Sequence, residues 1–106
     1  GAFLPSPGRS LYAAGKSALL SFTRSMAAEL AGRGIRVNAL APGPVDTDMV
    51  RNTGEAGVAG MARATFMGRL ASPDEMVGAV LYMVSDASSF MTGQCLIVDG
   101  GLVTAR

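Results

Sequence analysis

Apolar residues recur at helical spacing in two segments of the chain. The first runs from Leu11 to Arg33, with Ser10 in the N-cap position and Gly34 just past its end. The second begins with Ser72-Pro73-Asp74-Glu75, the pattern of a capping box with proline at the first helical position, and continues to about Ser85. The larger apolar residues form one stripe on each predicted helix: Leu19, Phe22, Met26 and Leu30 on the first, and Met76, Val77, Val80, Leu81 and Val84 on the second.

Two short apolar segments predict β-strands. Ile35 to Ala41 precedes the Pro42-Gly43-Pro44 break, and Cys95 to Val98 precedes a predicted tight turn at Asp99-Gly100-Gly101. Nearly continuous apolarity is typical of parallel strands that are buried on both faces. The order helix, strand, long excursion, helix, strand therefore predicts an α/β layer with a parallel strand pair.

The segment 45–70 has no clear period and is expected to be irregular or weakly helical. It carries four glycines and several apolar residues, including Val58, Met61, Phe66 and Met67. A long, partly apolar excursion of this kind is typical of a lid over a ligand site. The alternative is a tethered surface loop.

Composition excludes several classes of protein. The chain has 106 residues, of which 49% are hydrophobic and 16% charged, and its net charge is +1. Soluble domains average about 25% charged residues. Disorder requires low hydrophobicity and high net charge, so this composition excludes it. A chain of this length should also leave apolar surface for a partner to cover. Without a basic excess we expect no nucleic-acid binding, and no apolar stretch reaches the roughly 18 residues of a membrane helix.

The chain lacks the residues of several common site types. It contains no histidine, which excludes Ser-His-Asp and Cys-His nucleophile systems within it. A lone Cys95 cannot form an internal disulfide or a zinc site, so we expect no metal and a reducing, cytoplasmic compartment. General acid–base chemistry must therefore come from Asp, Glu, Tyr, Lys or Cys.

Tyr12 and Lys16 are the candidate catalytic pair. They lie four residues apart at the start of the first predicted helix, so they share a face. A cation beside a phenol stabilises the phenolate and lowers its pKa from about 10, which suits proton transfer near neutral pH. The alternative is that Lys16 packs its aliphatic stem over a half-buried Tyr12.

The context of this pair resembles the classical short-chain dehydrogenase/reductase family. Similar motifs follow in the family's order and spacing over nearly the whole chain: YAAGKSAL from 12, GIRVNALAPGPVDT from 34, GRLASPDE from 68, SDASS from 85, TGQ from 92 and VDGG from 98. The resemblance implies the C-terminal part of a Rossmann-type doubly wound parallel sheet. It also implies an NAD(P)-dependent oxidoreductase, acting on a secondary alcohol or ketone, including a 3-oxoacyl-type carbonyl, as a homodimer or homotetramer.

The resemblance also implies residue roles. Tyr12 would be the acid/base, and Lys16 would hold the nicotinamide ribose and lower the Tyr12 pKa. Val45 would bind the carboxamide through its main chain. The implied NAD- or NADP-binding residues are Tyr12, Lys16, Pro42, Gly43, Val45 and Thr47. The alternatives are a plain turn at Pro42-Gly43 and a helix cap at Thr47, and Asn38 is expected to support the strand end.

Several parts of the family's pattern are missing. The glycine-rich turn after the first strand, the Asn-Ala-Gly motif and the asparagine of the proton relay are absent, and Ser6 and Ser10 lie too close to Tyr12 to match the family's catalytic serine. We therefore expect residues 1–106 to be a partial dinucleotide-binding domain without its N-terminal part. The alternative is a catalytically inactive fragment or an oligomerisation module.

Overall fold

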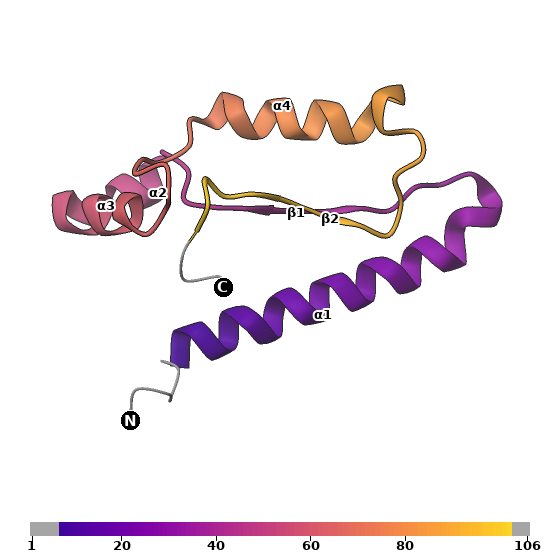
Figure 1. Cartoon of the computed structure of the whole chain (residues 1–106), viewed down its shortest axis with the longest axis horizontal. Coiled ribbons are helices and arrows are strands. Elements are labelled where there is room, and N and C mark those ends of the chain that lie inside the picture. Colours follow the sequence, from indigo (N-terminus) through magenta and orange to yellow (C-terminus); the bar gives the residue numbers. More distant parts are fainter. Residues whose placement is uncertain (1–6, 103–106) are drawn as a thin grey trace. The chain divides into compact units, whose positions relative to one another are not determined.

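The computed structural model describes residues 7–102, with side chains from Ala13 onward, and has the predicted α/β character (Figure 1). Its elements are α1 (Pro7–Leu30), the 3₁₀ turn η1 (Ala31–Arg33), β1 (Ala39–Pro42), α2 (Asp48–Arg51), α3 (Gly54–Arg63), α4 (Pro73–Val84), the 3₁₀ turn η2 (Asp86–Ser88) and β2 (Cys95–Val98). The chain divides into two compact units. The first contains α1 and the segment 91–95, and the second contains 40–90 and the segment from 96 onward.

β1 and β2 form a parallel pair. The N–H of Ala39 donates to the carbonyl of Gln94, and the N–H of Gly43 donates to that of Val98, both at 2.9 Å, so the partner numbers rise together. The bounds predicted for β2 are confirmed. β1 begins later than predicted, because the Val37 N–H donates to the Thr92 hydroxyl and the first half of the segment is held by such loop contacts instead of a ladder.

The predicted start of the first helix is wrong. α1 already includes Pro7, so Ser10 lies inside the helix and is not its N-cap. Proline is tolerated in a first helical turn because its φ is helical and its missing N–H would have no partner there. At the other end, η1 closes on Gly34 at φ +74°, whose N–H donates to the Ala31 carbonyl at 3.0 Å. This left-handed cap confirms the predicted role of Gly34.

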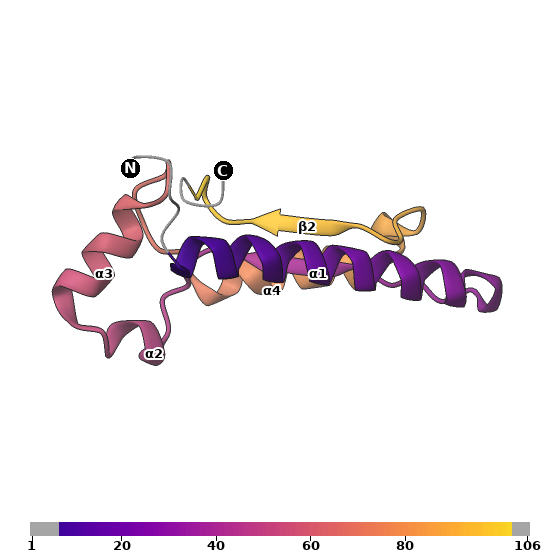
Figure 2. The same cartoon turned by 90° about the horizontal axis from the view of Figure 1, so that it is seen from below.

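The segment 45–70, which was expected to be irregular or weakly helical, contains two helices, α2 and α3, joined and flanked by non-helical residues. α2 and α3 follow each other and are in contact, as Figure 2 shows. The Thr47 hydroxyl accepts from the Val50 N–H at 3.3 Å, and the Thr53 hydroxyl donates to the Val50 carbonyl at 2.6 Å. Short-range threonine bonds therefore define the ends of α2 where the sequence has no apolar period.

α4 confirms its predicted bounds and runs alongside the strand pair within the second unit (Figure 1). Its apolar stripe lacks a cover: Val77, Leu81 and Val84 are 53%, 61% and 71% exposed. Among the described apolar side chains only Ala27 and Ala39 are buried. This agrees with the surplus of apolar surface expected from composition. None of the helices in the part that the structure describes is long and apolar enough to span a membrane.

Candidate functional site

The loop that follows β1 packs tightly against the end of β2. A Cβ on Gly43 would lie 2.7 Å from the Asp99 Cα and 2.8 Å from the Asp99 carbonyl oxygen, closer than side-chain atoms approach a backbone. The Gly43 N–H also continues the strand ladder to Val98. Only glycine permits this approach, so Gly43 does more than form a plain turn.

Val45 is joined to Ala71 by an isolated parallel bridge. The Ala71 N–H donates to the Pro44 carbonyl at 2.9 Å, and the Asp46 N–H donates to the Ala71 carbonyl at 2.8 Å. Both bonds use the main-chain groups of Val45's neighbours. Because successive peptide groups of an extended chain point to opposite sides, the N–H and C=O of Val45 itself face away from Ala71. This main-chain pair therefore lies on the side of the loop opposite to Ala71.

The next residues of the loop fasten the start of α2. Arg51 holds Asp46 in a two-point ion pair, with nitrogen–oxygen distances of 2.7 and 2.9 Å. The Arg51 hydrogen bond lowers the pKa of the Asp46 carboxyl. Thr47 acts as the N-cap of α2, which is the alternative that its sequence position left open. A hydroxyl that accepts one bond still has its own proton to donate, so the cap and a ligand contact are compatible.

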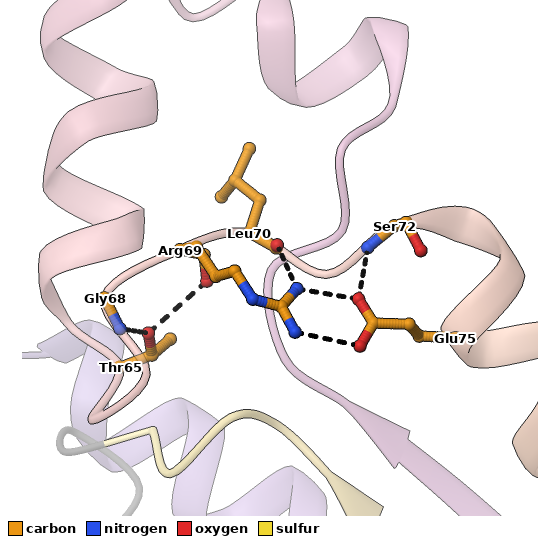
Figure 3. A network of polar contacts seen from close by, with 6 residues as sticks. All are labelled: Thr65, Gly68, Arg69, Leu70, Ser72 and Glu75. Carbon is orange, nitrogen blue, oxygen red and sulfur yellow. Dashed lines mark hydrogen bonds and ion pairs between the residues drawn. The ribbon is translucent and has the colours of Figure 1, made fainter.

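A second polar network holds the segment between α3 and α4 (Figure 3). The Arg69 guanidinium donates to both carboxylate oxygens of Glu75, at 2.7 and 3.0 Å, and to the Leu70 carbonyl at 3.1 Å. The Ser72 N–H donates to the same carboxylate at 2.8 Å. Arg69 first and the Ser72 N–H second lower the pKa of Glu75 from 4.5 to about 2. Glu75 is therefore an anion at every physiological pH.

A small cavity of about 90 Å³ lies between the loop and this network. Its walls include Gly43, Met67, Arg69, Met76, Val98 and Asp99. The loop after β1 and the Arg69–Glu75 network therefore both contribute to the walls of this small cavity. In the described range 7–102, no three His, Cys, Asp or Glu side chains form a cluster suited to a metal ion.

Two predictions about the strand ends are confirmed. The Asn38 amide donates to the Met91 carbonyl at 2.9 Å, and its oxygen accepts from the Gln94 N–H at 3.1 Å, so this side chain supports the strand end. After β2 the chain turns at Gly100 and Gly101, with φ of +62° and +78°. The Gly101 N–H donates to the Asp99 carboxylate at 2.9 Å, as expected of a tight turn.

The predicted site residues fall into two groups. Pro42, Gly43, Val45 and Thr47 lie together on one loop in the second unit. Tyr12 and Lys16 lie one turn apart on α1 in the first unit, where Lys16 is half-buried and the Tyr12 side chain is outside the described residues. The roles of all six residues stay predictions.

Sequence reasoning missed the residues that support the loop. Ala71 has no distinguishing chemistry, and Arg69 lies in the loop before α4 whereas Glu75 lies in its first turn, so the period of a single helix does not pair them. Glu75 was singled out only as a capping residue. An arginine shortly before a capping-box glutamate was the one signal that could have indicated this network.

Comparison with known proteins gives consistent matches. A family profile described as enoyl-(acyl carrier protein) reductase matches residues 1–103. The chain is 48% identical, over 97% of its length, to an uncharacterized short-chain type dehydrogenase/reductase of Sinorhizobium fredii, of which it covers 19%. It is 42% identical, over 92% of its length, to the 3-oxoacyl-[acyl-carrier-protein] reductase of Thermotoga maritima, of which it covers 39%.

Solved structures show the same similarity. The 3-oxoacyl-[acyl-carrier protein] reductase of Brucella melitensis superposes with a TM-score of 0.79 at 46% identity, over 87% of this chain and 34% of that one. A short-chain dehydrogenase family protein of Francisella tularensis superposes with a TM-score of 0.74 at 33% identity, over 86% of this chain and 42% of that one. These relatives share a Rossmann-type fold, of which the described helices and parallel strands form a part. The chain spans about two-fifths or less of the length of each of these relatives.

Proposed function

Since the chain belongs to the short-chain dehydrogenase/reductase family, we propose that it is the C-terminal part of an NAD(P)-dependent oxidoreductase. In this proposal residues 1–106 form part of a dinucleotide-binding domain that an N-terminal part completes. The reaction moves a hydride between the nicotinamide and the carbon of a secondary alcohol or ketone. The observation that carries the proposal is the loop after β1, whose Val45 main-chain pair is directed away from the bridge to Ala71.

The residues of this loop fit a nicotinamide. A carboxamide has one oxygen acceptor and an NH₂ donor, which match the N–H and C=O of one residue. Val45 offers these groups, and Thr47 adds a hydroxyl at the start of α2. Pro42 and Gly43 form the end of a parallel strand, where ligands bind in doubly wound sheets. NAD and NADP share this end of the molecule, so the loop serves either.

Tyr12 and Lys16 supply the proton chemistry. The bound cofactor gives or takes the hydride. In the reducing direction, Tyr12 donates its phenolic proton to the carbonyl oxygen as that oxygen becomes an alcohol. The Lys16 ammonium stabilises the resulting phenolate and binds the ribose hydroxyls. The helix periodicity of α1 places the two residues on one face, as this division of roles requires.

A 3-oxoacyl thioester is the substrate class that we propose to test first. The names of the relatives refer to 3-oxoacyl-acyl carrier protein, whereas the matching profile is described as an enoyl reductase. The two reactions differ in whether a C=O or a C=C bond is reduced. We favour the carbonyl because a tyrosine donor protonates an oxygen directly. We also propose a homo-oligomeric, cytoplasmic enzyme.

The test uses the full-length protein and follows the loss of reduced nicotinamide with a 3-oxoacyl or a 2-enoyl thioester. Tyr12→Phe is expected to lower turnover by about 10²–10⁴-fold and to leave the cofactor Kd nearly unchanged, because it removes only the acid/base. Tyr82→Phe is the matched control, since Tyr82 lies on α4 and has no role in the proposal. Lys16→Met should impair both binding and turnover. Substantial activity in Tyr12→Phe would contradict the assigned role.

A further inference from the structure

The segment that carries α2 and α3 begins and ends at the same place in the fold. It leaves at Val45 and returns at Ala71, and the two parallel-bridge bonds join these ends at 2.8 and 2.9 Å. Two-residue bridges are weak when both sides are free to move, because so few bonds must offset the ordering of the chain. The orientation of Val45 therefore depends on what holds Ala71.

The two neighbours of Ala71 are held by one ion pair, Leu70 through Arg69 and Ser72 through Glu75. Glu75 receives two N–H bonds from Arg69 and one from the main chain of Ser72. Arg69 also donates to the carbonyl of Leu70, the residue directly before Ala71 (Figure 3). The residue before Ala71 is thus bonded to Arg69 and the residue after it to Glu75, and the ion pair joins both to the first turn of α4.

The other end of this segment is fastened as well. The Thr65 hydroxyl accepts from the Gly68 N–H at 2.9 Å and donates to the Ala62 carbonyl at 2.9 Å. The Phe66 N–H donates to the Gly101 carbonyl at 2.8 Å. The turn after α3 is therefore held independently of Glu75, so loss of the Glu75 contacts should loosen 69–72 without releasing α3.

We propose that Glu75, together with Arg69, is a positioning residue for the cofactor loop: it fixes Ala71, and through the bridge it fixes the direction of the Val45 N–H and C=O. This inference rests on the proposed function of Val45. Neither side chain touches the cofactor in this scheme. Charge matters because a two-point guanidinium–carboxylate pair sets orientation as well as distance. The carboxylate also stays charged throughout the physiological range.

The first measurement is amide hydrogen exchange in the full-length protein without cofactor. Glu75→Ala removes both the ion pair and the Ser72 bond, and we expect the Ala71 and Asp46 amides to exchange about tenfold faster. Glu75→Gln keeps an oxygen that can accept from the Ser72 N–H, so we expect the same amides to exchange only about threefold faster. This variant replaces Glu75→Ala in the test if the alanine variant does not fold. Asp74→Asn is the control, because Asp74 is the adjacent carboxylate and forms no ion pair within the described residues.

The second measurement separates the two ends of the cofactor. Binding of NADH or NADPH, whichever is tighter, is compared with that of ADP-ribose or its 2′-phosphate, which lack the nicotinamide. We expect the Glu75 variants to weaken the dinucleotide about 2- to 10-fold, as for one impaired hydrogen bond, and to leave the ribose compound unchanged. Asp74→Asn should change neither.

The outcomes distinguish this inference from the proposed function. Equal weakening of both compounds would show a general structural role, and unchanged exchange at Ala71 in Glu75→Ala would show that Glu75 does not hold Ala71. Either result would overturn the positioning role alone. Wild-type protein that binds neither compound would overturn the proposed function and the positioning role together.

Discussion

Replacing Gly43 by alanine should separate the ends of β1 and β2. The added methyl would lie 2.7 Å from the Asp99 Cα, whereas ordinary contacts begin at 3.4 Å, so the two backbones must move apart by about 0.7 Å. Such a shift would stretch the 2.9 Å bond from Gly43 to Val98 to about 3.6 Å, which is no longer a hydrogen bond. Overpacking costs about 1–3 kcal/mol and the lost bond about 1 kcal/mol. We therefore expect Gly43→Ala to lower the free energy of unfolding by about 2–4 kcal/mol.

The assay is chemical denaturation of the full-length protein, with Gly60→Ala as the matched control. Gly60 lies inside α3, and a Cβ there meets nothing within 4 Å. Alanine at Gly60 should stabilise the protein by about 0.5–1 kcal/mol, because glycine is the poorer helix former. The same substitution thus has opposite signs at the two positions. If Gly43→Ala changes stability by less than about 0.5 kcal/mol, the close approach to Asp99 does not constrain the loop.

Two further predictions concern pH and association. The pKa of Glu75 is lowered in the folded state to about 2, so the stabilisation by its carboxylate is complete above the ordinary pKa of 4.5 and is lost as the pH falls toward 2. The free energies of unfolding of the wild type and Glu75→Gln, plotted against pH, should therefore converge between pH 4.5 and 2. Parallel curves would contradict the ion pair. The isolated 106-residue chain should associate and show no hydride transfer, because a two-stranded sheet is marginal alone and Val84 and Phe90 are 71% and 104% exposed. Sedimentation with an activity assay checks this, and an active monomer would refute it.

Local patterns predicted the elements whose determinants lie within a few residues. The start of α4 follows from Pro73 and Glu75, and the turn after β2 follows from Asp99 and two glycines. Asn38 was expected to support a strand end, and its amide nitrogen and oxygen both form hydrogen bonds there, to the main chain of Met91 and Gln94. Each of these features depends on bonds or conformations that neighbouring residues complete, so a single sequence suffices to predict them.

The same reasoning failed where short polar bonds replaced apolar periodicity. The Thr47 and Thr53 hydroxyls bond to the backbone of Val50 and so define the ends of α2, a signal that is invisible to a search for apolar stripes. α1 begins before Ser10, at Pro7, because the fixed φ of proline suits the first position of a helix.

The sequence by itself determined the family of the chain and its α/β order, and it predicted the loop on which we propose that a nicotinamide binds. Only the tertiary structure revealed that Gly43 meets Asp99 and that Val45 pairs with Ala71. These contacts join residues that are far apart along the chain. Each contact depends on the path that the chain follows through the intervening helices, and neither the spacing nor the propensities of the two residues predict that path.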